Sequence, residues 1–550
     1  MSVKLHIEHH TADAAVGDTL FERAEALGVR VPTSCRKQGR CKECIVEVTE
    51  GMDCLSAPAA AEKHLSGNYR LSCCTKIAAE TGDVRFHTMR RGAMRIERHA
   101  FELPVRARQW KLDPTVTRDG ERILLDGVEI DRGTGPLHGL AIDIGTTTVV
   151  LRLLNLETGE VIADSSFENP QRFGGSDIMA RIHYDTVDGS RLLQRTLAGY
   201  LSRAIRELPA DPHSIYEVVI VGNSTMRDMF FRLSVHPIGQ SPYQSITEFD
   251  VAAGTRASTS LSESAVRLGL PVHPKARVYG LPVISGHVGA DAAACMLAVD
   301  LANEERLVAV MDIGTNTELI VGNKHKVLAA SCPAGPAFEG GQITFGMPGL
   351  TGAIENVAID DDGKFRITVI GDGPAEGICG SGLVDLLSEL LRTGRMNHLG
   401  RFEERKDAFV VADDNDRPVT FGEGDVSLLA QAKGANAAGL RIVFSEYGIR
   451  ASDLDVFYLA GGFGRHLQVD ASKRIGLIPD LDHSRIVQVG NASIEGACIA
   501  LLSRSKRAEL EALVKRVAHC RLETHPHFFD IFVEGCQFTL LQDTLEMGPP

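Results

Sequence analysis

Three cysteines lie within ten residues near the start of the chain, in the stretch CRKQGRCKEC. They are Cys35, Cys41 and Cys44, and one further candidate follows in YRLSCCTK as Cys73 or Cys74. Three close thiolates and one distant thiolate are typical of a plant-type [2Fe–2S] site, although the first spacing here is one residue longer than usual. The pattern therefore predicts an iron–sulfur site. The alternative is structural zinc, which normally shows two separate C-x-x-C pairs.

The same stretches, SCRKQGRCKECIVEV and YRLSCCT, resemble the ferredoxin β-grasp domain. The resemblance implies four metal ligands: Cys35, Cys41, Cys44 and Cys73. Cys74 stands where that family usually has glutamine, and Cys54 is interpreted as a bystander on a loop. Gly39 lies inside the loop, where it would let backbone amides approach the sulfides and stabilise the reduced state.

A second pattern occurs twice, 169 residues apart, in GLAIDIGTTTVVLRLLN and VAVMDIGTNTELIVGN. In each copy an apolar strand leads into D-I-G-T-x-T and then into a second apolar strand. Gly145 and Gly314 allow the backbone to turn sharply. The sequence predicts exposed amides that bind phosphate oxygens, at Thr146, Thr147, Thr315 and Asn316. Asp143 and Asp312 are the predicted catalytic carboxylates, which would hold Mg²⁺ directly or through water.

This repeated hairpin resembles the superfamily of acetate and sugar kinases, heat-shock chaperones and actin. The resemblance implies ATP as ligand, clamped between two related lobes, and adds two nucleotide-binding candidates. VFYLAGGFGRHL looks like the adenosine motif, with Gly461 and Gly462 after a strand. GICGSGLVDLL places Gly380, Ser381 and Gly382 at a helix N-terminus, where amides are free for an anion or a ribose.

Two other segments look motif-like. Asn223 and Ser224 follow an apolar strand and could face the same cleft. Asp291 begins a helix, and we interpret it as a helix cap.

The chain divides into four parts by its patterns. Residues 1–92 show two alternating strands and a helix from Asp18 to Gly28, and residues 93–137 are a polar linker with one hairpin. ATPase lobe I is predicted over 138–304, and lobe II with the C-terminal segment over 305–550. The fold class is therefore α+β, with an N-terminal β-grasp ferredoxin domain followed by a two-lobed α/β actin-like ATPase domain.

Composition excludes several classes. The 550 residues carry a net charge of −14 and one tryptophan, which argues against a nucleic-acid partner. The N-terminus has no secretory signal pattern, and no apolar run reaches the length of a membrane span. Twelve cysteines in such a chain predict a cytoplasmic protein with metal ligands and buried thiols. The late cysteines, read as buried thiols, are Cys498, Cys520 and Cys536.

The two parts together, with NPQRFGGSDIMARI and GNSTM between the hairpins, are similar to the reductive activators of corrinoid iron–sulfur proteins and corrinoid methyltransferase systems. The resemblance implies ATP-dependent reduction of Co(II) to Co(I) by one electron from a [2Fe–2S] cluster. The implied cofactors are that cluster, ATP and Mg²⁺. The implied partners are a corrinoid methyltransferase protein and an electron donor, and the expected assembly is a homodimer. Relatives of this type are expected to carry a separate middle domain, for which only about 45 residues remain here.

Three alternatives stay open from the sequence. The chain could be an ATP-driven activator of another low-potential enzyme, although such activators lack a ferredoxin domain. It could be a redox-regulated small-molecule kinase, for which the sequence shows no catalytic base. It could also be a binding module that only exchanges a cofactor, and such a module would not need the cysteines.

Overall fold

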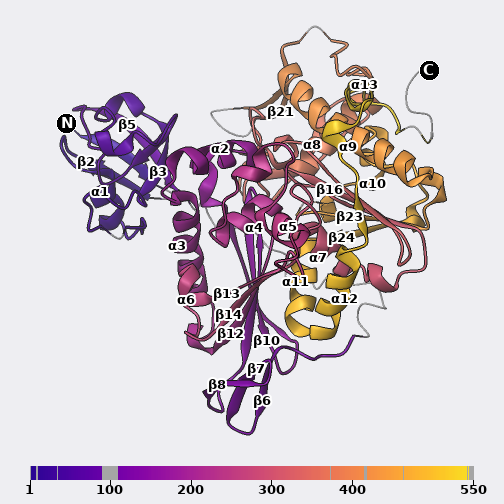
Figure 1. Ribbon diagram of the computed structural model, residues 1–550. Coiled ribbons are helices and arrows are strands. Elements are labelled where there is room, and N and C mark those ends of the chain that lie inside the picture. The colour runs from indigo at the N-terminus through magenta and orange to yellow at the C-terminus, as the bar shows by residue number, and fades with distance from the viewer. Residues whose placement is uncertain are drawn as a thin grey trace.

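The computed structural model describes residues 2–7, 10–33, 35–89, 110–371, 373–404, 406–413, 418–462, 464–541 and 543. Figure 1 shows the order of its parts. A small N-terminal sheet, in indigo, lies beside the helices of the first of two larger α/β lobes. No helix among these residues is long and apolar enough to cross a membrane.

The N-terminal part is a five-stranded sheet in the order β2-β1-β5-β3-β4. Its elements are β1 (Val3–Ile7), β2 (His10–Ala14), α1 (Leu20–Ala26), β3 (Ile45–Glu50), β4 (Tyr69–Leu71) and β5 (Gly82–Thr88). The alternating strand predicted at the N-terminus buries Val3, Leu5 and Ile7 completely. The predicted helix begins at Leu20, two residues later than expected, because Thr19 is its N-cap and forms a capping box with Glu22.

Part of the predicted linker is folded. Residues 116–132 form a three-stranded antiparallel meander rather than one hairpin, comprising β6 (Val116–Asp119), β7 (Arg122–Leu125) and β8 (Val128–Arg132). Val116, Ile123 and Ile130 are buried against lobe I, so this segment joins the core of that lobe. The remaining linker positions, up to residue 109, lie outside the described residues.

Lobe I is built on a six-stranded sheet in the order β11-β10-β9-β12-β14-β13. Its strands are β9 (His138–Ile144), β10 (Thr148–Asn155), β11 (Val161–Glu168), β12 (Ile215–Val221), β13 (Leu261–Ser264) and β14 (Arg277–Gly280). Its helices are α2 (Ile178–Asp188), α3 (Leu192–Glu207), α4 (Ser224–Phe230), α5 (Ile246–Ala252), α6 (Ala265–Leu268) and α7 (Ala290–Ala298). All seven residues of β9 are buried, as expected for a central strand covered on both faces.

Lobe II has its own six-stranded sheet, in the order β24-β23-β15-β16-β17-β25. Its strands are β15 (Val308–Asp312), β16 (Thr317–Gly322), β17 (Val327–Cys332), β23 (Val456–Ala460), β24 (Ile486–Gly490) and β25 (Val517–His519). Smaller sheets contain β18 (Ala353–Ile359), β19 (Phe365–Val369), β20 (Gly377–Ile378), β21 (Ala408–Ala412) and β22 (Val419–Gly422). The helices are α8 (Gly380–Arg392), α9 (Glu423–Tyr447), α10 (Val469–Arg474), α11 (Ala492–Leu502), α12 (Arg504–Val514) and α13 (Phe528–Gly535).

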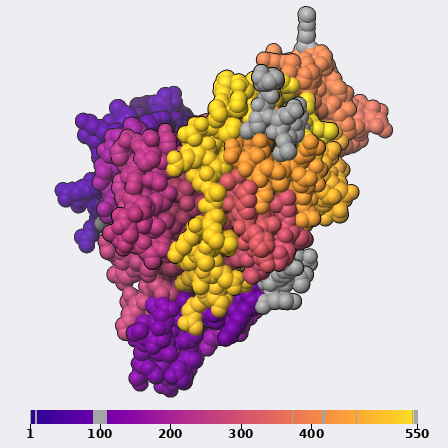
Figure 2. Space-filling view, turned by 45° about the vertical axis from the view of Figure 1, so that its right-hand side comes forward, coloured from indigo at the N-terminus to yellow at the C-terminus, as the bar shows by residue number. Residues whose placement is uncertain are grey.

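The two lobes repeat one unit. The run β11-β10-β9-β12 in lobe I matches β17-β16-β15-β23 in lobe II, with the same antiparallel and parallel pairings. The lobes meet where α7 packs on α11, both rich in small residues. A Cβ atom on Gly496 would lie 2.0 Å from the carbonyl oxygen of Ala294, so only glycine allows this approach. In Figure 2 the C-terminal segment, in yellow, runs along the boundary between the magenta and orange regions.

Candidate functional site

Strand pairing brings two of the predicted metal ligands together. Cys44 precedes β3 and Cys73 follows β4, and Ile45 pairs with Leu71 across the two strands. The Cys44 thiol donates to the Cys73 sulfur over 3.2 Å, and this hydrogen bond lowers the pKa of Cys73 to about 6. The site therefore favours a thiolate, the form that binds metal.

The other two predicted ligands lie in the preceding loop. Burial opposes ionisation of Cys35, but hydrogen bonds from the Cys41 backbone and side chain lower its pKa to about 7. Arg36, Lys37 and Lys42 have positive φ angles, and such turns aim successive amides inward. The amide of Gly39 (φ +68°) contacts the Cys73 sulfur, and a Cβ atom there would lie 2.8 Å from Cys74 Sγ.

The cysteines thus form two pairs, Cys35 with Cys41 and Cys44 with Cys73. Among the described residues, no three metal-ligating side chains are already gathered into one metal site. Two pairs of sulfurs, two stabilised thiolates and several inward amides fit a [2Fe–2S] cluster, which takes two thiolates on each iron. The Sγ of Cys74 lies 3.8 Å from that of Cys73, at the edge of this group, and Cys54 lies elsewhere, near Gly82.

The ligand loop lies against lobe I. Arg195 of α3 donates to the carbonyl oxygen of Cys41 over 3.5 Å, and Lys42 approaches Asp188 of α2 at 3.7 Å. Glu47 of β3 pairs with Arg172 at 2.8 Å. The cluster-binding loop and the larger lobe therefore share a charged, largely buried interface.

The repeated hairpins meet at one cavity of about 290 Å³, at the lower end of the range for small-molecule sites. Nearly all the nucleotide-binding candidates predicted from sequence line it: Asp143, Gly145, Thr146, Thr147, Asp312, Gly314, Thr315, Asn316, Gly380, Ser381, Gly461 and Gly462. Gly382 does not line the cavity. Gly382 lies in the first turn of α8. A Cβ atom there would be 2.4 Å from the carbonyl oxygen of Ile354, so its role is close packing against β18.

The cavity has an acidic floor. Burial raises the pKa of Asp143 to about 7, of Asp312 to about 6 and of Asp291 to about 8. Asp143 accepts a hydrogen bond from Asn491 Nδ2 at 3.1 Å, and Asp312 accepts one from the Cys295 thiol at 3.2 Å. Such closely placed buried carboxylates repel one another, and a divalent cation among them would relieve that repulsion. The donor set of carboxylates suits Mg²⁺.

The structure revises the interpretation of Asp291. Gly289, not Asp291, is the N-cap of α7, and the Asp291 carboxylate lines the cavity while accepting from the Ala292 amide at 2.8 Å. Asn223 also lines the cavity and donates to Thr146 Oγ1 at 3.1 Å. Ser224 does not line it, because its hydroxyl donates to the carbonyl oxygen of Ser285.

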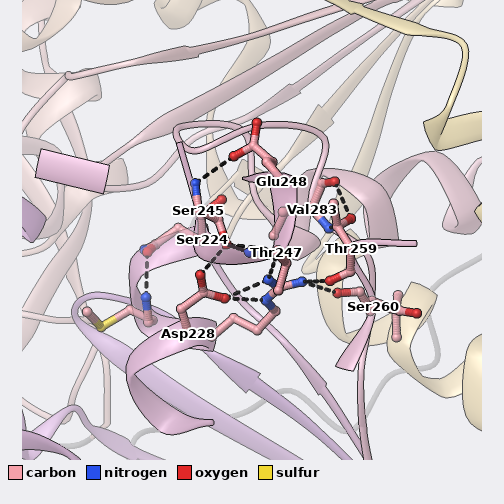
Figure 3. A network of polar contacts seen from close by, with 12 residues as sticks. Ser224, Asp228, Ser245, Thr247, Glu248, Thr259, Ser260 and Val283 are labelled. Atoms are coloured by element: carbon pink, nitrogen blue, oxygen red, sulfur yellow. Dashed lines mark hydrogen bonds and ion pairs between the residues drawn. The ribbon is translucent and has the colours of Figure 1, made fainter. Parts of the chain in front are cut away.

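A buried network supports the helix that follows Asn223. Figure 3 shows Asp228 near Ser245 and Thr247 at the start of α5, and its carboxylate accepts from the Ser245 hydroxyl at 2.5 Å. The fully buried Arg227 donates to Asp228 at 2.6 Å and to the carbonyl oxygens of Thr259 and Leu281 at 2.8 and 2.9 Å. A buried charge pair with all these bonds satisfied fixes α4 rigidly behind the cavity.

Several cavity residues escaped sequence reasoning. Asn491 and Ser493 lie at the start of α11, far along the chain from the hairpins, and Glu339 lies in the 3-10 turn Ala337–Glu339 after β17. Asn169, in the quoted NPQRFGG stretch, binds the first hairpin through Nδ2 to the carbonyl oxygen of Gly145 at 2.8 Å. The sequence signal for Asn169 was the Asn-Pro dipeptide that it forms with Pro170, since this dipeptide predicts a turn directly after a strand.

Comparison with known proteins gives matches along most of the chain. A model described as the 2Fe-2S iron-sulfur cluster binding domain matches residues 3–78, one for the RACo middle region matches 138–304, and one for the C-terminal ASKHA domain of RACo matches 306–546. The chain is 32% identical over 447 residues to the corrinoid activation enzyme RamQ of Eubacterium limosum, covering 76% of this chain and 73% of that protein. It is 24% identical over 434 residues to the [Co(II) methylated amine-specific corrinoid protein] reductase of Methanosarcina barkeri, covering 72% and 76%.

A solved structure described as a reductive activator for corrinoid, iron-sulfur protein superposes with a TM-score of 0.72 at 27% identity. The match covers 98% of this chain and 99% of that one. The expectation that this chain lacks a middle domain was therefore wrong. The middle-region model matches 138–304, the segment that sequence analysis assigned to lobe I.

Proposed function

The chain belongs to the family of reductive activators of corrinoid proteins, and we propose from this premise that it uses ATP to return Co(II) to Co(I) on a corrinoid methyltransferase protein. The observation that carries the proposal is that one chain joins two sites. A loop with two cysteine pairs packs on lobe I, and the D-I-G-T hairpins of lobes I and II together line an acidic cavity.

The chain's residues have separate tasks in this proposal. The cluster is held by the side chains of Cys35, Cys41, Cys44 and Cys73. When bound, it stores and passes one electron. Asp143 and Asp312 hold Mg²⁺, and the amides of Thr146, Thr147, Thr315 and Asn316 bind the phosphates. Gly461, Gly462, Gly380 and Ser381 complete the nucleotide site at the lobe II wall.

ATP has a thermodynamic purpose here. Ferredoxin-type potentials are about −400 mV, and reduction of Co(II) from such a donor is uphill. A gap of about 0.1 V costs about 2.3 kcal/mol for one electron. Nucleotide binding offsets this cost if the closed lobes bind the partner in the form that is easier to reduce, since a ligand shifts an equilibrium by its difference in affinity for the two states.

Several finer points belong to the same proposal. We take residues 1–92 as the ferredoxin domain, 138–304 as lobe I and 305–550 as lobe II, and 93–137 as a linker whose meander at 116–132 packs on lobe I. We propose a homodimer that receives electrons from a separate donor protein and works in the cytoplasm, where the cysteines outside the cluster would stay reduced. The net charge of −14 supports a protein partner rather than a nucleic acid.

The test is anaerobic mixing of the reduced protein with Co(II) corrinoid proteins, followed by visible spectroscopy with and without Mg-ATP. We expect Co(I) to appear only with ATP and to be lost in Cys41→Ser and in Asp312→Ala. Cys54→Ser, a buried cysteine of the same domain outside the ligand loop, is the matched control and should keep activity. ATP turnover with no cobalt change for any corrinoid protein would contradict the proposal.

A further inference from the structure

One carboxylate of the cavity bridges the two lobes. Glu339 closes the short 3-10 turn Ala337–Glu339, which follows β17. Its Oε2 accepts from the Thr147 hydroxyl at 2.9 Å and also from the Thr315 hydroxyl. The two hydroxyls lie 3.0 Å apart, although they come from different hairpins. Three oxygens thus converge where the phosphate-binding turns face each other.

Five other acidic side chains line the cavity, namely Asp143, Asp291, Asp312, Glu318 and Glu355, and the first four have hydrogen-bond partners elsewhere. Asp143 is bound by Asn491 and Asp312 by the Cys295 thiol. Asp291 accepts from the start of its own helix, while Glu318 accepts from Ser331 within the sheet at 3.3 Å. Among the described acidic side chains that line the cavity, Glu339 is the one that contacts hydroxyls of both hairpins.

We propose that Glu339 is the general base that orients and deprotonates the water attacking the γ-phosphate of ATP. This inference rests on the proposed function, because it concerns the same nucleotide site. Phosphoryl transfer needs a group that positions the nucleophile in line with the bond to be broken. A carboxylate held between the two phosphate-binding turns faces the terminal phosphate rather than the adenosine end of the cavity.

The step balances. The water oxygen forms a bond to the γ-phosphorus, and the bond from that phosphorus to the β,γ-bridging oxygen breaks. ADP leaves with the electron pair, inorganic phosphate forms, and the water proton passes to Glu339. The hydroxyls of Thr147 and Thr315 hold the carboxylate in place, so they act as positioning groups.

The surroundings of Glu339 suit a base. Burial raises its pKa, while the two threonine hydroxyls and the nearby charge of Arg181 lower it, and Asp312 raises it. Arg181 comes from α2 and is itself buried, with Nε bound to the carbonyl oxygen of Gly175 at 3.0 Å. The net effect is a carboxylate more basic than an exposed one, which improves proton transfer near neutral pH.

The experiment compares Glu339→Gln, Glu339→Asp and the wild-type full-length protein. Rates of phosphate release under saturating Mg-ATP are measured beside the Kd for Mg-ATP, with thermal unfolding as a check of the fold. We expect Glu339→Gln to lower kcat by about 10²- to 10⁴-fold, with a Kd within about threefold of wild type. Glu339→Asp keeps the base but moves it, so its rate should lie between the two.

Two outcomes would overturn the inference. One is a Glu339→Gln protein that hydrolyses ATP at more than about a third of the wild-type rate. The other is an equal loss of binding and rate in both variants, which would make Glu339 a structural tie between the hairpins. A failure of the proposed function itself looks different, because wild type would then hydrolyse Mg-ATP without a cobalt change in any corrinoid protein.

Discussion

Glu62 is a buried carboxylate whose removal should release one cluster ligand. It is 2% exposed and accepts from Arg70 Nε at 3.0 Å, from the Leu71 amide at 2.8 Å and from the Thr75 hydroxyl at 3.2 Å. The Ala59 amide donates to its other oxygen at 2.6 Å. Two of these contacts flank the predicted ligand Cys73, so Glu62 fixes the turn that carries it.

The size of the effect follows from burial. Glu62→Gln keeps the side-chain volume but removes the charge, and it leaves Arg70, itself 3% exposed, without its carboxylate. Breaking a buried pair in this way costs about 3–5 kcal/mol. The exposed pair of Glu50 and Arg85, at 3.5 Å in the same sheet, is the matched control. Its loss through Glu50→Gln should cost less than about 1 kcal/mol.

The pH dependence has a definite sign. Burial opposes ionisation of Glu62, but the bonds from Arg70 and from the backbone hold its pKa below the ordinary 4.5. A depressed folded-state pKa contributes stability that is present above the unfolded pKa and is lost as the pH falls through the folded value. The wild-type domain should therefore weaken below about pH 4.5, and Glu62→Gln should lack that part of the acid sensitivity.

The assay follows the visible absorption of the iron–sulfur site in the full-length holoprotein during urea unfolding, at neutral pH and at pH 4. That signal reports the N-terminal sheet alone, which avoids a two-state assumption for the whole chain. We expect the midpoint for Glu62→Gln to fall far more than that for Glu50→Gln. Equal, small shifts in both variants would refute the reasoning, since burial would then not decide the strength of the pair.

Three further changes test other contacts. Arg172→Ala should free the ferredoxin domain from lobe I, because Glu47 loses a largely buried partner worth about 3 kcal/mol; small-angle X-ray scattering should show a larger radius of gyration. Gly496→Ala should destabilise the packing of α7 on α11 by about 1–3 kcal/mol, measured by thermal unfolding, whereas Gly424→Ala in α9, where a Cβ meets nothing within 4 Å, should not destabilise. Cys74→Ser should leave the iron content and visible spectrum of the holoprotein intact.

For each of these three predictions, one outcome would contradict the reasoning. An unchanged radius for Arg172→Ala, with Arg203→Ala as the exposed control, would mean that other contacts dominate the docking. Equal unfolding midpoints for the two glycine variants would show that the helices can move apart at no cost. Loss of iron in Cys74→Ser but not in Cys73→Ser would exchange the two ligand assignments.

The sequence alone was enough for everything that depends on local pattern. The triplet from Cys35 to Cys44 predicted the iron–sulfur site because sulfur ligands in one loop keep their spacing whatever surrounds them. The repeat around Asp143 and Asp312 predicted two related lobes, and the run β11-β10-β9-β12 in one sheet does match β17-β16-β15-β23 in the other. The buried alternation of β1 and the extent of α1 were predicted to within a residue or two, since both follow from side-chain periodicity and capping.

Only the tertiary structure decided what depends on contacts between distant segments. No local sequence pattern marks Glu339 or Asn491 as site residues. Folding brings Glu339 to both hairpins and Asn491 to the first one, over sequence separations of 24 to 348 residues. The placement of Asp291 in the cavity and of Gly382 behind it depends on how a helix is seated on its sheet, which periodicity does not specify. The docking of the ferredoxin domain on lobe I likewise joins surfaces whose charges become complementary only when both are folded. Local patterns therefore set the chemistry of each site, and long-range packing set its geometry.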